Sequence, residues 1–261
     1  MKKLKAIFAK AVLYNKTLYA GTAILLFWYI LHLTVASAAI PSPYKTIVNF
    51  IAIFPGTLSL HLAVSLLRIS AAVLLSLIVG SLFGLWTGTS EKADAFVTPL
   101  VYMLYPLPKI AFLPILMILL GLGNTSKVAL IVIIIIFQII IAVRDGVKEI
   151  PKELFYSVRS LGLNRPEIYR HLILPAVLPK IITSLRISIG VSISILFFGE
   201  NFATTYGIGY FIMNSWLMAN YVEMFSGILA LSLMGLLLFK LIDLAENRYC
   251  RWIKTGGKDL S

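Results

Sequence analysis

Very few reactive side chains in this sequence stand at the spacings that catalytic or metal sites require. The three histidines, His32, His61 and His171, share no metal-ligand spacing, and Cys250 is the only cysteine, so no internal disulfide exists. No Ser/His/Asp arrangement is present. The segment 256–258, Gly-Gly-Lys, lacks the first glycine and the Ser or Thr of a phosphate-binding loop. We therefore expect no catalytic residue, metal or cofactor on this chain.

Ionisable residues inside apolar stretches are the stronger clues, because a charge within a bilayer usually faces protein or a water-filled path. Lys109 follows Pro106 and Pro108, which free backbone groups, so the three residues could face an anion on a translocation path. The alternative is that Lys109 snorkels to the membrane surface or pairs within a dimer interface.

A second candidate on such a path is Glu200 with its neighbour Asn201. Glu200 ends an apolar stretch and begins a Gly-rich segment through Tyr210, which could re-enter the membrane where protein buries it. An equally good interpretation is a gate loop on the outer side. Arg68 is expected to meet lipid headgroups or a docked partner, with substrate contact less favoured. Gly80 and Gly84 form a small-xxx-small pair, which favours close helix packing.

Composition identifies the elements that must position these residues. Of the 261 residues, 59% are apolar and 13% charged, and the mean hydropathy is +0.93. Soluble domains are about 45–50% apolar and about a quarter charged, so a soluble or disordered chain is excluded. The net charge of +12 comes from Lys and Arg in short blocks between apolar runs, which indicates membrane topology rather than nucleic-acid binding.

Six apolar stretches are long enough to cross a bilayer, which needs roughly 20 residues. They predict an all-α, polytopic membrane protein with spans at Leu18–Val35, Leu62–Trp86, Phe96–Leu120, Val128–Val143, Ile181–Phe198 and Met224–Leu244. Prolines break the third span, which we expect as two half-segments. The fourth is short, and Lys127 and Arg144 are expected to snorkel outward at its ends.

The charge distribution predicts the orientation. With the N-terminus in the cytoplasm, nineteen of the 23 Lys and Arg residues fall in inner segments, so both termini are expected there. Ala36-Ser37-Ala38 resembles a signal cleavage site, but the preceding apolar run is longer than a signal core, which favours an anchored helix. We expect an N-terminal cytoplasmic segment at 1–17, one transmembrane domain at 18–253 and a cytoplasmic tail at 254–261.

The connection between the fourth and fifth spans, residues 145–180, is long and organised. Pro151, Glu153 and an apolar i, i+4, i+7 pattern predict a short amphipathic helix, with Gly162 as its left-handed C-terminal cap. Asn164 and Glu167 suit a capping box, and the second helix is expected to stop at Pro175. Long structured loops are usually functional. The alternative is an interfacial helix held by its arginines to anionic lipid.

At these residues the chain resembles the "EAA" loop of ABC-importer permeases, written E-A-A, three residues, Gly, nine residues, Ile, one residue, Leu-Pro. Gly162, Leu174 and Pro175 match in type and spacing, and Leu172 replaces Ile. The first three positions are Tyr-Ser-Val, so the Glu of the motif is absent and Glu153 lies one turn early. The resemblance implies a surface that couples to an ATPase through Glu153, Tyr156, Ser157, Val158, Arg159, Gly162, Leu163, Leu172, Leu174 and Pro175.

The resemblance extends over residues 40–253 to the nitrate/sulfonate/bicarbonate/taurine branch of binding-protein-dependent permeases. The similar pieces occur in the same order and spacing: Pro41-Ser42-Pro43, Ser65-Leu66-Leu67-Arg68, Pro106-Leu107-Pro108, Gly121-Leu122-Gly123, Glu200-Asn201 and the stretch 206–212.

This resemblance implies the transmembrane subunit of a type I ABC importer in the bacterial or archaeal inner membrane. Its implied partners are a second permease copy, two ABC ATPase subunits that hold ATP and magnesium, a solute-binding protein and the lipid bilayer, with no nucleic acid. The implied solute is small and anionic or zwitterionic, such as a sulfonate, nitrate or bicarbonate. A secondary transporter or channel is the alternative, but it predicts internal repeats and membrane-embedded acids, and Glu200 is the only candidate acid.

Overall fold

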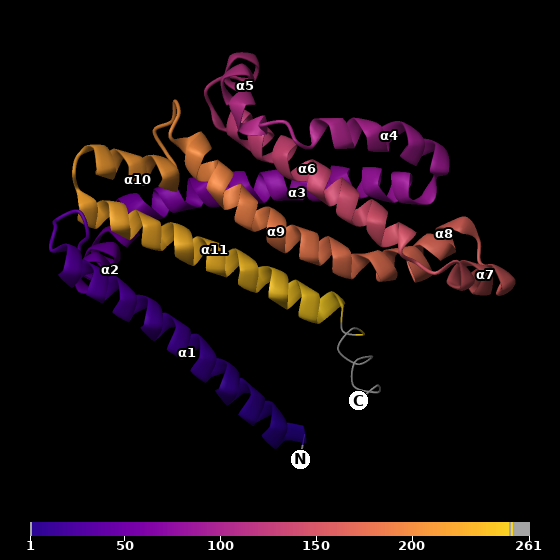
Figure 1. Cartoon of the computed structure of the whole chain (residues 1–261), viewed down its shortest axis with the longest axis horizontal. Helices are drawn as coiled ribbons and strands as arrows, with labels where there is room; N and C mark the ends of the chain where they lie inside the picture. Colours follow the sequence, from indigo (N-terminus) through magenta and orange to yellow (C-terminus); the bar gives the residue numbers. More distant parts are fainter. Residues whose placement is uncertain (1, 251, 253–261) are drawn as a thin grey trace. The chain divides into compact units, whose positions relative to one another are not determined.

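The computed structural model describes residues 2–250 and 252, and its regular structure over these residues is helical (Figure 1). Within residues 2–250 and 252, five helical segments are long and apolar enough to span a membrane, and a sixth span results if one bent pair of helices counts as one. The five are Leu18–Val35, Pro43–Thr89, Asn124–Lys148, Arg165–Glu200 and Tyr221–Tyr249, and the bent pair is Glu91–Leu104 with Lys109–Leu120. The expected all-helical, six-span architecture is thereby confirmed.

The chain divides into two compact units. Unit 1 comprises residues 1–59 and 211–230, and unit 2 comprises residues 60–210 and 231–261. Residues 251 and 253–261, and with them the whole predicted tail at 254–261, lie outside the described residues. The helices are α1 (Lys2–Val35), α2 (Pro43–Ile53), η1 (Phe54–Leu58), α3 (Ser59–Thr89), α4 (Glu91–Leu104), η2 (Lys109–Phe112), α5 (Leu113–Leu120), α6 (Asn124–Lys148), α7 (Lys152–Ser160), α8 (Arg165–Ile168), η3 (Tyr169–Ile173), α9 (Leu174–Glu200), α10 (Ile208–Leu217) and α11 (Tyr221–Tyr249).

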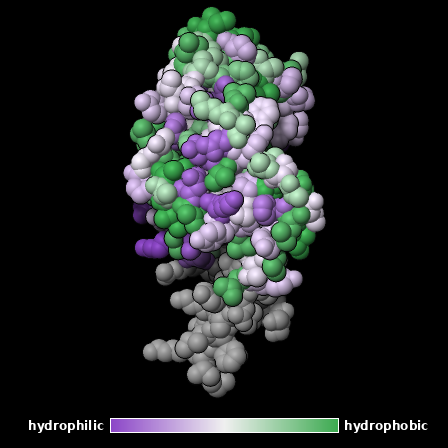
Figure 2. Space-filling model, turned by 90° about the vertical axis from the view of Figure 1, so that its left-hand side faces the viewer, coloured by the Kyte–Doolittle hydropathy of each residue, from purple (hydrophilic) through white to green (hydrophobic). Residues whose placement is uncertain are grey.

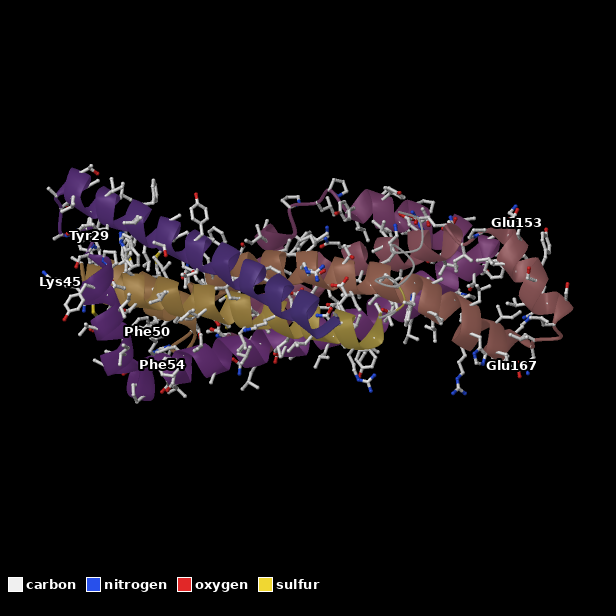
Figure 3. The ribbon with its side chains drawn as sticks, turned by 90° about the horizontal axis from the view of Figure 1, so that it is seen from below. Tyr29, Lys45, Phe50, Phe54, Glu153 and Glu167 are labelled. Carbon is white, nitrogen blue, oxygen red and sulfur yellow. The ribbon has the colours of Figure 1, made fainter. Side chains whose placement is uncertain are left out.

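Unit 1 is held by aromatic and polar contacts. The Trp28 indole donates to the Pro41 carbonyl at 3.1 Å and stacks on Phe225, with ring centroids 5.4 Å apart. Asn49 on α2 donates to the Ser226 hydroxyl at 3.0 Å. Phe50 and Phe54, labelled in Figure 3, lie one turn apart with ring centroids at 5.4 Å. Leu18–Val35 has no buried residue within its own span.

In unit 2, α6 is the central helix and α3 and α9 run beside it (Figure 1). Ile131, Ile135, Ile139 and Val143 recur at helical spacing on α6, and each is fully buried. Large apolar side chains are exposed on the helices of unit 2, among them Leu67, Leu82 and Leu236. Figure 2 shows one face of the molecule, on which apolar and hydrophilic residues lie side by side. An apolar exterior is what a lipid-facing surface requires.

The contact of α3 with α6 depends on glycines. A Cβ at Gly84 would lie 2.6 Å from the Cβ of Val143, and one at Gly80 would lie 2.9 Å from Ile139 Cγ2. Gly88, one turn further along, faces Val147 in the same way at 2.6 Å. The predicted small-residue face is therefore a close helix contact, and it extends one turn beyond the predicted pair.

The third span is broken, as expected: α4 and the segment Lys109–Leu120 meet at 84°. The fourth span differs from the expectation, because α6 runs from residue 124 to 148 and takes in both flanking cations. Lys127 is 1% exposed and Arg144 is 7% exposed, so the prediction that they snorkel outward is wrong. Arg144 instead binds Asp145 at 2.7 Å and the Thr98 hydroxyl of α4 at 2.9 Å. Polar partners inside the unit replace water for both side chains.

Candidate coupling surface and buried ion-pair site

The helix pair α7–α8 lies at the end of unit 2 where α6 ends and α9 begins, and Glu153 and Glu167 mark it in Figure 3. Gly162 ends α7 with φ +80°, in the left-handed region predicted for it. The Leu163 amide donates to the Val158 carbonyl at 3.2 Å, and the Gly162 amide donates to the Arg159 carbonyl at 2.9 Å. These two bonds form a Schellman cap, which fixes the turn between the two helices.

The start of α8 is equally well defined. The Glu167 amide donates to Asn164 Oδ1 at 3.0 Å, and the Asn164 amide donates to Glu167 Oε2 at 2.7 Å. This reciprocal pair is the capping box expected from the sequence. The turn is therefore determined at both ends by local hydrogen bonds.

The second predicted helix does not stop at Pro175, and that prediction is wrong. A π-helical turn, η3, connects α8 to α9, so that 165–200 is one continuous helical segment. The Leu174 amide donates to the Tyr169 carbonyl, five residues back. Because this wide turn has already shifted the hydrogen-bond register, Pro175 enters in the first turn of α9, where its missing N–H is tolerated.

One face of α7 and the turn after it packs on the rest of unit 2, and the other face is exposed. Phe155, Val158 and Leu163 contact the buried cluster that includes Val147 and Ile168. Leu154, Tyr156 and Leu161 are exposed, the last at 77%. The Tyr169 hydroxyl lies 2.7 Å from the Thr89 hydroxyl of α3. The element is thus anchored to the membrane helices and presents an uncovered apolar surface.

The remaining coupling residues named from the sequence lie on the same element. Ser157 donates to the Glu153 carbonyl at 2.9 Å. Leu172 packs against the buried apolar cluster of unit 2, whereas Leu174 is 43% exposed at the start of α9. The structure therefore places the coupling residues named from the sequence on or directly beside the helix pair α7–α8.

At the other end of α9, Arg68 and Glu200 form a buried ion pair. Nη1 of Arg68 lies 2.6 Å from Oε1 of Glu200, and the two side chains are 5% and 0% exposed. The expectation that Arg68 meets headgroups or a docked partner is therefore wrong. Its sequence context could not reveal a partner 132 residues away.

Every polar atom of this pair is engaged. Glu200 also accepts from the Ser65 hydroxyl at 2.8 Å and the Gly209 amide at 2.8 Å. Arg68 donates from Nε and Nη2 to Asn124 Oδ1, at 2.9 and 2.7 Å, and from Nη1 to the Tyr206 carbonyl at 2.8 Å. Such full satisfaction is what a buried pair needs to offset its desolvation.

A second buried cation, Lys127, binds the loop 201–207 that follows α9. Lys127 Nζ donates to the carbonyls of Leu122, Gly123 and Ala203, at 2.9, 3.3 and 3.3 Å. His61 accepts from the Gly207 amide at 3.0 Å. Segment 201–207 is thus held by side chains of α3 and α6, and the re-entrant and gate-loop interpretations of this segment both stay predictions.

The residues predicted to line a path do not meet in one place. Lys109 Nζ donates to the Tyr105 carbonyl at 2.7 Å and lies over the rings of Tyr105 and Phe137, while Glu200 belongs to the ion pair. Pro106 and Pro108 are exposed beside Lys109, and Asn201 follows the end of α9. Among the described residues no three His, Cys, Asp or Glu side chains could hold a metal ion.

Comparison with known proteins identifies the class. Residues 76–254 match the family described as "Binding-protein-dependent transport system inner membrane component", and the chain belongs to this family. It is the transmembrane subunit of an ABC importer, a transport component of the inner membrane. The two sequence pieces that carry Arg68 and Glu200 were part of the predicted resemblance, and the structure places them in contact.

Two curated relatives and one solved structure are similar over most of the chain. The taurine transport system permease protein TauC of Escherichia coli is 30% identical over 246 residues, 90% of each chain. The putative aliphatic sulfonates transport permease protein SsuC of Bacillus subtilis is 28% identical, over 84% of this chain and 79% of its own. An inward-facing MetNI methionine ABC transporter structure shares the fold, with a TM-score of 0.56 at 19% identity over 78% of this chain and 97% of its own. None of these supports a secondary transporter or channel.

Proposed function

We propose that two copies of this chain form the membrane core of an importer for a small anionic or zwitterionic solute, of which a sulfonate is the leading class. Two ATPase subunits bind the α7–α8 elements and hold ATP and magnesium, and a solute-binding protein delivers the solute outside. The relatives named for taurine, aliphatic sulfonates and nitrate support this class of solute. The positive-inside distribution of Lys and Arg supports cytoplasmic termini and a cytoplasmic α7–α8 element.

The observation that carries the proposal is the build of the α7–α8 element. Its turn is fixed by the Gly162 cap and the Asn164 capping box, yet Leu154, Tyr156 and Leu161 are uncovered. A rigid element with an exposed apolar face is suited to receive a fitted partner. The rival, an interfacial helix on lipid, would need no such fixed turn.

The continuity of α8, η3 and α9 suggests how the partner acts. Closure of the ATPase pair on ATP displaces α7 and α8, and the displacement passes along α9, whose 27 residues extend about 40 Å at 1.5 Å each. The far end of α9 carries Glu200 and the tied loop 201–207. The two permease copies then alternate between inward-open and outward-open states, with ATP supplying the differential affinity.

Reconstitution tests the proposal. The full-length chain is expressed with the ABC ATPase and binding protein encoded beside it and placed in proteoliposomes with taurine, ethanesulfonate or nitrate outside. We expect the ATPase to co-purify with the chain and uptake of at least one solute to require ATP and the binding protein. Uptake driven by an ion gradient without ATP, or no bound ATPase, would refute the proposal.

A further inference from the structure

A cavity between the end of α4, α6 and α9 is lined in part by two neutral polar side chains that have no hydrogen-bond partner among the described residues. Its volume is about 330 Å³, and its wall includes Tyr105, Gln138 and Ser184 together with the charged residues Asp145, Glu149 and Lys180, all in unit 2. It is separate from the Arg68–Glu200 site, whose residues line none of it. A polar cavity within membrane helices needs an occupant or water.

Gln138 is the only strongly polar residue in the apolar stretch 128–143 of α6. Its side chain is half-buried, lines the cavity and has no hydrogen-bond partner among the described residues. An unpaired amide inside a membrane helix is costly, and such residues mark paths for polar solutes. The position of Gln138 is therefore unfavourable unless water or a polar solute occupies the cavity.

Ser184 on α9 supplies an unpaired hydroxyl to the same cavity. The residue is 3% exposed, and its Oγ has no hydrogen-bond partner in the described part of the chain. On the same helix, Thr183 donates to the Pro179 carbonyl at 3.0 Å and Ser192 to the Ser188 carbonyl at 2.7 Å, whereas the Ser188 hydroxyl is unpartnered among the described residues like that of Ser184 but lies outside the cavity wall. The free hydroxyl of Ser184 and the free amide of Gln138 form a neutral set of donors on facing helices.

The charges around the cavity indicate the class of ligand. At its α7 end, Lys180 pairs with Glu149 at 2.9 Å and Asp145 pairs with Arg144 at 2.7 Å, so these charges cancel. Lys109 has no acidic partner among the described residues, and its ammonium is held on Tyr105, which forms part of the cavity wall. One uncompensated positive charge beside neutral donors favours an oxyanion.

We propose that Gln138 and Ser184 form a contact site for the oxyanion head group of the solute inside the membrane, with Lys109 providing the positive field. This inference rests on the proposed function, because it deepens the identification of the solute class. Neutral donors bind an anion weakly, and weak binding suits a site that must release its ligand.

Thiol chemistry tests the site without transport. In a Cys250→Ser background, Gln138→Cys in proteoliposomes is exposed to 2-sulfonatoethyl methanethiosulfonate, itself a small sulfonate, and to the cationic trimethylammonioethyl analogue. With rates normalised to a free thiol, we expect preference for the sulfonate reagent, protection by taurine or ethanesulfonate, and loss of the preference on adding Lys109→Met. Absence of labelling, or preference for the cation, would overturn the proposal.

Uptake measurements on matched variants provide a second test of the site. Gln138→Leu and Ser184→Ala should each lower uptake of the transported solute by about five- to tenfold, the effect of losing one or two hydrogen bonds. ATPase co-purification should remain normal. Ser188→Ala is the control, because Ser188 is also buried and unpartnered but does not line the cavity. Normal uptake in both cavity variants would refute the site, whereas absence of ATP-driven uptake in the wild type would refute the proposed function instead.

Discussion

Arg68 Nη1 and Glu200 Oε1 lie 2.6 Å apart in a site that water barely reaches, and the pair joins α3 to the end of α9. The same carboxylate accepts from the Gly209 amide, so the pair also fixes the start of α10. The two ends of α9 thus carry different contacts: the helix pair α7–α8 at one end and a buried charge network at the other.

A double-mutant cycle measures this pair. Arg68→Gln and Glu200→Gln should each destabilise the protein by about 3–5 kcal/mol, because each leaves a buried charge without its partner. The double variant should be less destabilised than the sum of the singles, since no uncompensated charge remains. Chemical or thermal unfolding in detergent gives the values. Additive losses would mean that the two charges do not interact.

The α3–α6 contact allows a packing test. Gly84→Leu should cost about 1–3 kcal/mol or more, because its side chain would overlap Val143, and lower the Tm by several degrees. Gly21→Leu is the control, since nothing lies within 4 Å of a Cβ there. Equal Tm values for the two variants would contradict the close contact. Combining Gly84→Ala with Val143→Ala should relieve part of the overlap.

The turn at Gly162 predicts a graded response. Gly162→Val should cost about 1–3 kcal/mol locally, because a β-branched residue resists φ +80°, and Gly162→Ala should be milder. No atom of the residues that the structure describes lies within 4 Å of the added Cβ, so the effect is backbone strain and membrane insertion should survive. We expect the Val variant to lose ATPase in a pull-down or to hydrolyse ATP without uptake. Wild-type binding and uptake would favour the lipid-anchoring alternative.

Orientation is tested by single cysteines in a Cys250→Ser background. A cysteine at Lys45 should react with an impermeant maleimide added outside intact cells, whereas one at Ser160 should not. In the unaltered chain, burial and the nearby Glu246 carboxylate raise the pKa of the Cys250 thiol, so less reactive thiolate is present at neutral pH and labelling should be slow. Labelling of Ser160→Cys from outside would contradict the proposed topology.

Sequence periodicity and local capping predicted much of this fold. The six spans, the break in the third, the left-handed Gly162 and the capping box at Asn164 all follow from residues close together in the chain. Such features depend on helix length, proline geometry and nearby hydrogen bonds, which sequence spacing reports directly.

The errors have two causes, partners that are distant in sequence and local geometry that leaves no sequence signature. Arg68 looks like an interfacial cation by position, but Glu200, 132 residues along the chain, pairs with it in the interior. Lys127 is held inside by the nearby Leu122 and Gly123 carbonyls as well as by the distant Ala203 carbonyl. Pro175 looks like a helix stop because the π-helical turn before it carries no sequence signature. The unpaired state of Ser184 likewise depends on packing that spacing does not reveal.

The central claim is that α7 is the surface on which the ATPase docks. Its most direct test is photo-crosslinking with benzoyl-phenylalanine at Tyr156, which is 63% exposed, in the assembled transporter. Phe155, packed on the unit, and Lys45 in unit 1 serve as matched controls. We predict a crosslink to the ATPase from position 156 and none from 155 or 45. Absence of an ATPase crosslink at 156, or an equal yield at all three positions, would contradict the claim.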